Sequence, residues 1–354
     1  MTTSGTVTFT MTRDDICNAS LRLVGAIDPE NTAGATTNQV TYAAQALNLL
    51  IKQWEAIGLQ LWERRYGAIF PQVNQQVYVL GDPSASSGDH ACVSSPLGYG
   101  FIKTNLTNPA VAGATTIVLD TISTQSVALA PVKRDVPMAS VGLPAITIAS
   151  TWYIGIQQDN GIIFWTTVNG APSGTTVTLT AGLTYAASAS NTVYSYQTKL
   201  VRPLRVLDGF FRQNAGNDIP ALIIPRENYN RFGMKSSNGT TIQLYYDPSE
   251  NKGNLYVYPT TNVINGVLYI EYTSPIQDMD ASSDNFDFPQ EWLNALKWNL
   301  ALAIAPEYEV AETKFKQLQF MAEASFEMVK PYDQEFASMY IQPSNWTYTD
   351  NRGF

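Results

Sequence analysis

The chain has 354 residues, a net charge of −9 and a pI of about 4.7, and only 14% of its residues are charged. This acidic balance argues against a protein that grips nucleic acid by neutralising phosphates, because that mode needs clustered Lys and Arg. The two cysteines form no disulfide framework, and no apolar run approaches the ~20 residues that a membrane-spanning helix requires.

Two amphipathic helices are predicted near the N-terminus. Residues 12–24 begin with Thr12 and carry Asp15 three residues later, a spacing that resembles a capping box. Residues 38–57 place apolar side chains at helical spacing over four turns, and Trp54 belongs to this stripe. Gly58 follows as a residue suited to end the helix.

The middle of the chain favours β structure. Strand-like alternation begins between residues 69 and 80, and the segment 82–198 is poor in charge and rich in Thr, Ser, Gly and Ala. Asp159-Asn160-Gly161 predicts a hairpin turn. The best strands of the segment are 115–119, 152–157, 162–167 and 175–180. We expect this segment to form a small all-β domain inserted into the main one.

The main domain resumes near Leu200 with further strands. Apolar residues alternate at 242–246, 255–257 and 268–272, with turn residues at 251–253 and 265–266. Strands joined in this order by short turns predict an antiparallel meander.

Two closing helices are predicted before the C-terminus. The first should start near Phe288, after the capping residue Asp287, and its segment 300–305 is apolar on nearly every side, so we expect it to be enclosed. Pro306 separates it from the second. That helix carries a packing seam made of Ala311, Phe315, Leu318, Ala322, Ser325 and Val329.

Possible chemical sites have weak support. His90, the one histidine, lies two residues before Cys92, but a zinc site needs four positions filled, so an ordinary pair of loop residues is predicted. A calcium loop is not favoured in the acidic stretch, because Ser283 and Pro289 stand where it requires Gly and Glu. The acidic residues of this loop, which we expect to be solvated, are Asp278, Asp280, Asp284 and Asp287.

Other charged residues were weighed in the same way. A hydrolase pair could be sought among Glu291, Glu307, Glu309, Glu312, Glu323 and Glu327, but charged helix faces are more often solvated. The basic spots Arg64-Arg65 and Arg202/Arg205 are too small for a DNA-binding stripe and are predicted to make intersubunit salt bridges. No catalytic site, metal site or cofactor is predicted.

Several short motifs, each present once, follow one another in a characteristic order along the chain. They include Leu21-Arg22-Leu23-Val24-Gly25-Ala26, Tyr78-Val79-Leu80-Gly81, Arg202-Pro203-Leu204-Arg205-Val206, Phe288-Pro289-Gln290-Glu291-Trp292 and Ala305-Pro306-Glu307-Tyr308. This ordered set resembles the head-to-tail adaptor proteins of podoviruses, also described as tail accessory or head-completion proteins.

The resemblance implies a ring, commonly of twelve subunits, that sits beneath the portal protein at the head–tail junction of the virion. The protein would be made in the host cytoplasm, would meet the tail nozzle or tube and the tail fibres or spikes, and would let packaged DNA pass through its lumen. A ring of twelve such acidic chains would carry roughly −108 charges and repel DNA rather than bind it. A C-terminal arm, residues 341–354, would contact the portal or a neighbour through Trp346, Tyr348, Arg352 and Phe354.

The sequence thus predicts an α+β fold with a four-helix adaptor core, an antiparallel β meander and an inserted small all-β domain. The core would comprise residues 1–81 and 199–340, and the insert residues 82–198. The residues expected to pack the helices of the ring are Trp54, Trp292, Leu296, Leu300, Phe315 and Leu318. Two rival functions stay open: a tail-associated cell-wall hydrolase, and a glycan- or receptor-binding tail protein that acts through the insert.

Overall fold

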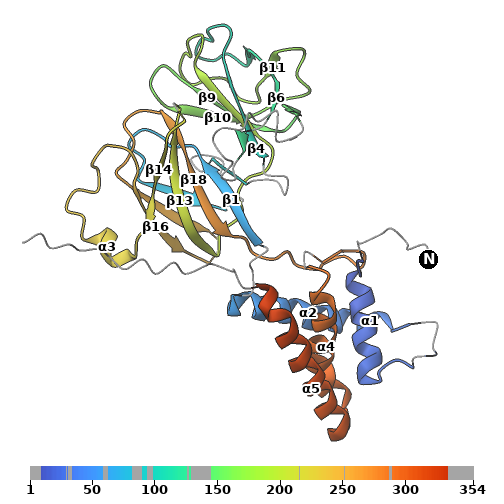
Figure 1. Cartoon of the computed structure of the whole chain (residues 1–354). Helices are drawn as coiled ribbons and strands as arrows, with labels where there is room; N and C mark the ends of the chain where they lie inside the picture. Colours follow the sequence, from blue (N-terminus) through green and yellow to red (C-terminus); the bar gives the residue numbers. More distant parts are fainter. Residues whose placement is uncertain are drawn as a thin grey trace, which may run out of the picture. The chain divides into compact units, whose positions relative to one another are not determined.

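The computed structural model describes residues 9–28, 30, 34–58, 63–81, 90–93, 99–125, 127–128, 145–214, 216–250, 252–286 and 289–333. The chain forms two compact units (Figure 1). The β unit is Glu63–Gln277, and the helical unit combines the two ends of the chain, Met1–Trp62 and Asp278–Phe354.

The helical unit begins with two helices that the sequence predicted, and both predictions are confirmed. Thr12 caps α1 and exchanges hydrogen bonds with Asp15 in a capping box, while Thr36 and Gln39 do the same for α2. Gly25 and Gly58 end these helices in the left-handed conformation that glycine adopts without strain. The described helical elements of this unit are α1 (Arg13–Val24), α2 (Thr37–Ile57), α4 (Trp292–Ile304), α5 (Glu312–Val329) and the 3-10 turns Ala305–Tyr308 and Lys330–Asp333.

Helix α4 lies in contact with α1, α2 and α5. Its first residue, Trp292, is only 1% exposed and meets the indole of Trp54 edge-on at 5.6 Å between centroids. Phe326 of α5 completes this aromatic group at 5.3 Å from Trp54. Because the three side chains come from three helices, their burial holds α2, α4 and α5 together.

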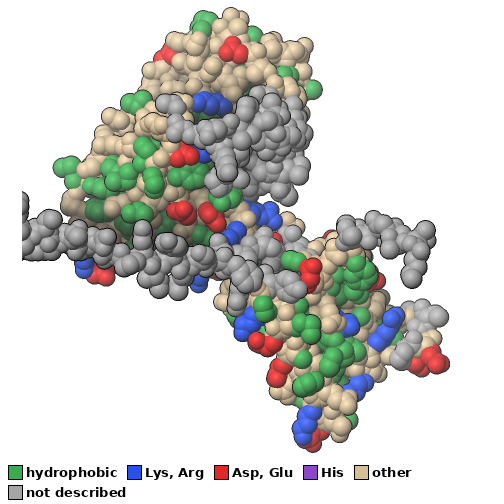
Figure 2. Space-filling model, viewed as in Figure 1, with side chains coloured by type: hydrophobic (Ala, Val, Ile, Leu, Met, Phe, Trp, Pro, Cys, Tyr) green, Lys and Arg blue, Asp and Glu red, His purple; other side chains and the backbone are tan. Residues whose placement is uncertain are grey.

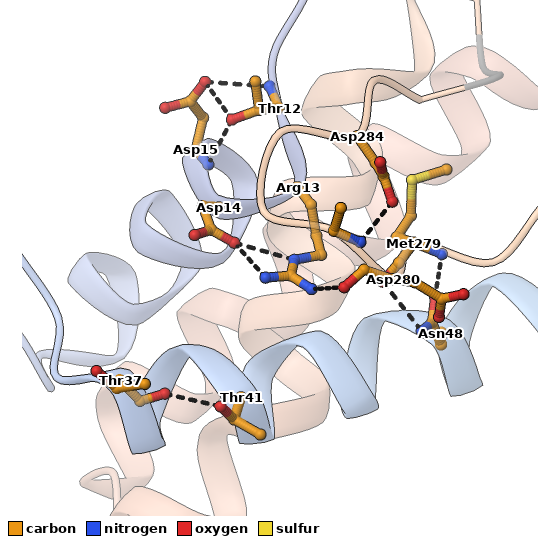
Figure 3. A network of polar contacts seen from close by, with 11 residues as sticks. Thr12, Arg13, Asp14, Asp15, Thr37, Thr41, Asn48, Met279, Asp280 and Asp284 are labelled. Atoms are coloured by element: carbon orange, nitrogen blue, oxygen red, sulfur yellow. Dashed lines mark hydrogen bonds and ion pairs between the residues drawn. The ribbon is translucent and has the colours of Figure 1, made fainter.

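Polar contacts fasten the loop before α4 onto α1 and α2 (Figure 3). The Arg13 guanidinium donates to the Asp280 carbonyl at 2.6 Å and pairs with Asp14 at 2.8 Å. The Asn48 side chain accepts from the Met279 amide at 3.0 Å and donates to the Met279 carbonyl at 3.4 Å. Residues more than two hundred positions apart in the sequence are thereby joined.

Helix α4 departs from the prediction in two respects. It begins at Trp292 rather than near Phe288, because the Trp292 and Leu293 amides donate to Pro289 and Gln290 three residues back and close a turn there. The segment 300–305 is not enclosed on all sides, since Ala303 is exposed and Leu302 is half-buried. In α5 the predicted seam is confirmed at Leu318, Ala322, Ser325 and Val329, which are buried.

Two sheets of the β unit share one core. The first has the strand order β14-β13-β18-β1-β3, and the second has the order β15-β16-β17-β2. Leu80, Phe211, Leu255 and Ile270, from strands of both sheets, belong to the same buried cluster. The strands of the first sheet are β14 (Asp218–Pro220), β13 (Arg205–Gln213), β18 (Gly266–Thr273), β1 (Arg64–Ile69) and β3 (Ala91–Val93), and those of the second are β15 (Leu222–Ile223), β16 (Gln243–Pro248), β17 (Gly253–Tyr258) and β2 (Val77–Leu80). A short helix, α3 (Arg226–Asn230), follows β15.

A third sheet, of order β10-β9-β12-β4-β7, has a separate core with the short ladders β11-β5 and β6-β8 (Figure 1). The predicted turn at Asp159-Asn160-Gly161 is confirmed, because β9 and β10 pair antiparallel on either side of it. The strands are β10 (Ile163–Thr167), β9 (Tyr153–Gln157), β12 (Thr192–Tyr196), β4 (Tyr99–Asn105), β7 (Val127–Ala128), β11 (Thr176–Thr178), β5 (Thr116–Val118), β6 (Ser123–Gln125) and β8 (Ala145–Thr147).

An aromatic cluster fills the junction between the first and third sheets. His90 stacks on Trp165 at 4.0 Å between centroids, and its Nδ1 lies 3.0 Å from the Tyr196 hydroxyl. Gly155 permits this arrangement, because a Cβ there would lie 2.6 Å from the Trp165 indole. Burial, helped by the nearby Lys199 charge, lowers the pKa of His90 to about 3.

The predicted α+β fold with a four-helix adaptor core is wrong. The described residues form strands β1 to β18 but only five α-helices, four of them of seven residues or more, so the chain is mostly β with few helices. The physical reason is that strands make up most of the described secondary structure between Arg64 and Thr273, where α3 is a single short helix, whereas the long helices lie toward the two ends of the sequence.

The predicted meander is also wrong. β16 and β17 pair as expected, but the other edge of β17 is taken by β2, and β18 lies between β13 and β1 in the first sheet. Sequence neighbours β17 and β18 therefore contribute to opposite sides of the shared core. The domain boundaries inferred from composition, 82–198 for an insert, stay a prediction.

Truncation of Trp292 should severely destabilise the helical unit. Trp292→Ala leaves a cavity among three helices, and comparable core truncations cost about 3–5 kcal/mol. Denaturant unfolding followed by circular dichroism measures the loss. Phe9→Ala is the control, because Phe9 is 64% exposed in the same unit. A loss below about 1 kcal/mol for Trp292→Ala would contradict the proposed packing.

Removing the N-terminal cap of α1 should lower the free energy of unfolding by less than the Trp292 truncation does. Thr12→Ala deletes the oxygen that accepts from the Asp15 amide, and such caps are worth about 1 kcal/mol. The same measurement applies, with Thr41→Ala as the matched control, because the Thr41 hydroxyl only back-bonds to Thr37 within α2. Equal effects of the two substitutions would contradict the role of the cap.

Acid should weaken the β unit through His90. The folded-state pKa of His90, about 3, lies below its ordinary 6.5, so the unfolded chain binds the proton first and stability falls as pH drops from 6.5 toward 3. The loss at pH 5 should be about 2 kcal/mol. Because the chain has a single histidine, comparing unfolding at pH 7 and pH 5 with the His90→Phe variant isolates this contribution. An unchanged pH dependence in the variant would show that His90 is not the cause.

Candidate interaction surfaces

Helix α5 has two apolar sides. One is the buried seam described above, and the other, which we call the α5 stripe, consists of Phe320, Met321, Ala324 and Met328. Phe320 and Met328 are 70% and 72% exposed. Their spacing of i, i+1, i+4 and i+8 places them on one face of the helix. Figure 2 shows hydrophobic side chains gathered on the visible face of the helical unit, with charged side chains among and around them.

A groove of about 900 Å³ adjoins this stripe. Leu23 of α1 and Trp298 of α4 line it together with the N-terminal half of α5, including Leu318, Phe320 and Met321. Lys316 and Glu312, which also line the groove, pair with each other at 2.6 Å. The lining therefore mixes apolar side chains with this ion pair and a second lysine, Lys314.

Helix α2 presents a second exposed surface. Its outward side, which we call the α2 face, is poor in charge, since Lys52 is the one fully exposed charged residue of this helix. The exposed residues of the α2 face are Asn38, Tyr42, Gln45, Leu49, Gln53 and Ala56. Lys52 lies beside it and pairs with Asp278 at 3.0 Å. None of the groove-lining residues belongs to α2.

The residues predicted to pack the ring lie within the helical unit. Five of them, Trp54, Trp292, Leu296, Leu300 and Leu318, are buried, and Phe315 is half-buried. They hold the helices whose outer sides form the two surfaces above, and their part in a ring stays a prediction. The predicted arm residues Trp346, Tyr348, Arg352 and Phe354 lie outside the described residues.

His90 and Cys92 are both buried, and the prediction of a loop pair is wrong for Cys92, which belongs to β3 of the first sheet. Burial raises the pKa of the Cys92 thiol, and the pKa of Cys17 in α1 rises to about 12 for the same reason. Among the described residues, no group of three His, Cys, Asp or Glu side chains could hold a metal ion. The acidic loop instead serves the fold, since the Asp284 carboxylate accepts from the Ala281 amide at 2.6 Å.

The glutamates and arginines considered in the sequence analysis are either exposed or bonded to other residues of the same chain. The six glutamates named above are all exposed, and the groove is lined by only one of them, Glu312. Arg65 pairs with the buried Glu63 at 3.1 Å, and Arg64 approaches Glu271 at 3.9 Å. Arg202 donates to the Ser249 carbonyl at 2.9 Å. The intersubunit bridges predicted for these arginines stay predictions.

The sequence interpretation missed the α2 face and the α5 stripe. Helical spacing identifies the buried side of each helix and does not by itself show which residues stay exposed on the other side. The absence of Asp, Glu, Lys and Arg from residues 37–51 was the signal that could have identified the α2 face.

Part of the chain matches a known protein family. Residues 163–338 match the model of the family described as SU10 adaptor protein. The matched stretch runs from β10 through α5, and so includes the groove-lining part of α5. No curated protein matches the chain. None of the described helices is long and apolar enough to cross a membrane.

The family match, rather than the fold, indicates a class of protein. The matched region contains part of the shared core of the β unit, from strands β13, β16, β17 and β18, and the helices α4 and α5. The match supports a phage adaptor-type family for this chain, and with it a structural protein of the virion that contacts other head or tail proteins.

Proposed function

We propose that this protein is the head-to-tail adaptor of a short-tailed phage. Copies of the chain form a ring beneath the portal protein, extend the DNA channel, retain the packaged genome and provide the surface to which the tail attaches. The observation that carries the proposal is the adaptor-family match over residues 163–338. The protein acts by assembly rather than by catalysis.

The surface of the helical unit supports assembly. A monomer that stayed alone in water would leave the α5 stripe exposed, together with Tyr42 and Leu49 of the α2 face, and exposed apolar side chains gathered in this way commonly mark a contact site. The two surfaces lie on a compact set of helices, so they can be presented to a partner without rearrangement.

The charge of the chain supports passage of DNA. A net charge of −9 on every copy gives an assembled ring an acidic character that repels phosphates. DNA can then slide through the lumen because no basic stripe holds it.

The C-terminal segment supports attachment to the portal. Residues 341–354 contain Trp346, Tyr348 and Phe354 and few charges, a composition that suits a docking arm because aromatic side chains supply large contact areas. In this proposal the arm locks the ring to the portal or to a neighbouring subunit, and the β unit meets the tail nozzle or tube and the fibres or spikes.

Reconstitution with the portal protein of the same phage tests the proposal. The purified chain, mixed with portal and imaged by electron microscopy, should add a ring of density below the portal. A chain that ends before Gln342 should bind the portal more weakly, because the aromatic arm is gone. Trp346→Ala in the full chain is the milder companion variant.

Two results would contradict the proposal. One is a full-length chain that never associates with the portal at any concentration. The other is a phage lacking this protein whose capsids keep their packaged DNA as securely as wild-type capsids.

A further inference from the structure

We infer that, in a free copy of the protein, the groove beside α5 receives the arm of the same chain, residues 341–354, which returns along the α5 stripe. Trp346 would fill the groove against Trp298 and Phe320. The inference goes beyond the proposed function, which assigns the arm to a partner in the virion. In the free copy the arm enters and leaves its own groove, and a partner that binds the arm more tightly removes it.

The groove has the size and lining of a site for aromatic side chains. Its volume of about 900 Å³ lies within the range of about 300–1,000 Å³ found for ligand pockets. Leu23 of α1, Trp298 of α4 and Phe320 of α5 contribute apolar surface from three helices of one unit. Phe320 is 70% exposed, so covering it with another apolar side chain lowers the free energy.

The α5 stripe connects the groove with the point where the chain leaves α5. Phe320 and Met321 line the groove, and Ala324 and Met328 continue the same face through the last turns of the helix. The 3-10 turn Lys330–Asp333 follows at once. The segment beyond this turn therefore begins near one end of the stripe, and the groove lies at the other end.

The chain is long enough to return from the end of α5 to the groove. A helix rises about 1.5 Å per residue, so Gln317 of the lining lies about 18 Å from Val329 along α5. From Asp333 to Trp346 an extended chain spans up to about 43 Å, at about 3.3 Å per residue. Trp346 can therefore reach the groove even by an indirect course.

The lining also offers a cation beyond its own ion pair. Lys316 pairs with Glu312 at 2.6 Å, and Lys314 is the second lysine of the lining. A Cβ added at Gly25 would lie 3.0 Å from the Lys314 ammonium, so this charge stands at the end of α1, beside the groove. An occupant that brings a carboxylate to this place gains a charge-assisted contact.

The arm carries side chains that match this lining. Trp346, Tyr348 and Phe354 supply aromatic surface, which can bury a large area in a small groove. Asp350 is the acidic residue of the arm and is close enough in sequence to meet Lys314 while Trp346 fills the groove. Arg352 gives the arm a positive charge as well, so the arm and the lining both carry charges of both signs.

The covalent connection favours the arm of the same chain over other occupants. A segment joined to its site by a short linker has an effective concentration of about 1 mM. In a dilute solution of free copies, an arm from a second copy competes poorly with one that is already attached. The contact involves few side chains, so it opens readily and leaves the arm accessible to a partner.

Cysteine cross-linking within full-length chains tests the inference. One double variant combines Gln317→Cys in the groove lining with Thr347→Cys in the arm. The matched control combines Gln45→Cys with Thr347→Cys, because Gln45 is also an exposed glutamine but belongs to α2, which contributes none of the lining residues. Both native cysteines are buried with raised thiol pKa values, so a short bis-maleimide reagent should leave them unmodified.

The expected result is a cross-link within single chains. At about 1 μM protein, far below the effective concentration inside one chain, the Gln317 pair should cross-link about tenfold more often than the Gln45 pair. Peptide mass spectrometry of the monomer identifies the linked segments. Adding Phe320→Glu should reduce the yield to that of the control, because it places a charge in the apolar lining. Leu49→Glu, at a similarly exposed position of α2, should leave the yield unchanged.

Three outcomes overturn the inference. They are equal yields from the two cysteine pairs, cross-links found only between two chains, and a Phe320→Glu variant that keeps its circular dichroism and cross-links as well as its parent. The portal experiment separates these outcomes from failure of the proposed function. If the wild-type chain still adds a ring below the portal, only the groove contact fails. If the cross-link forms within the chain but no ring appears, the proposed function fails and the groove contact stands.

Discussion

The burial of α4 by the two ends of the chain is the constraint on which the helical unit depends. Trp292 meets Trp54 of α2 and Phe326 of α5, and the chain between α2 and α4 contains the entire β unit. Bringing such distant segments together lowers the conformational entropy of the chain between them, and the free energy gained by burying apolar side chains must exceed that loss. Hydrogen bonds from Arg13 of α1 and Asn48 of α2 to the loop before α4 fix the position of that loop relative to the two helices.

The same packing determines what the unit presents to a partner. Because α2 and α5 each bury one side against the other helices, their opposite sides face outward in a fixed arrangement. A helix that needed only to remain soluble would carry charge there. On α2 the one fully exposed charge is Lys52, and the α5 stripe exposes large apolar side chains. The inner sides of these helices therefore stabilise the fold, while their outer sides are available to a partner.

Local features of the structure were predictable, and distant pairings were not. The caps at Thr12 and Gly58 and the turn at Asp159-Asn160-Gly161 depend on a few adjacent residues, so the sequence revealed them. The pairing of β17 with β2 depends on residues far apart in the chain, and no local pattern distinguishes it from a meander with β18. The helices were recognised correctly, but the share of the chain that forms strands was underestimated, because short strands give a weaker pattern than long helices. The buried positions of the helices were recognisable from spacing, but the interaction surfaces required knowledge of which sides remain exposed.

Radical footprinting of the assembled virion tests the central claim most directly, namely that the outer sides of these helices are covered by protein in the particle. Oxidation of Phe320 and Met321 should fall strongly between the isolated chain and the virion. Met234, 67% exposed in the β unit, provides an internal reference for reagent dose in the isolated chain. Equal oxidation of Phe320 and Met321 in both states would contradict the account.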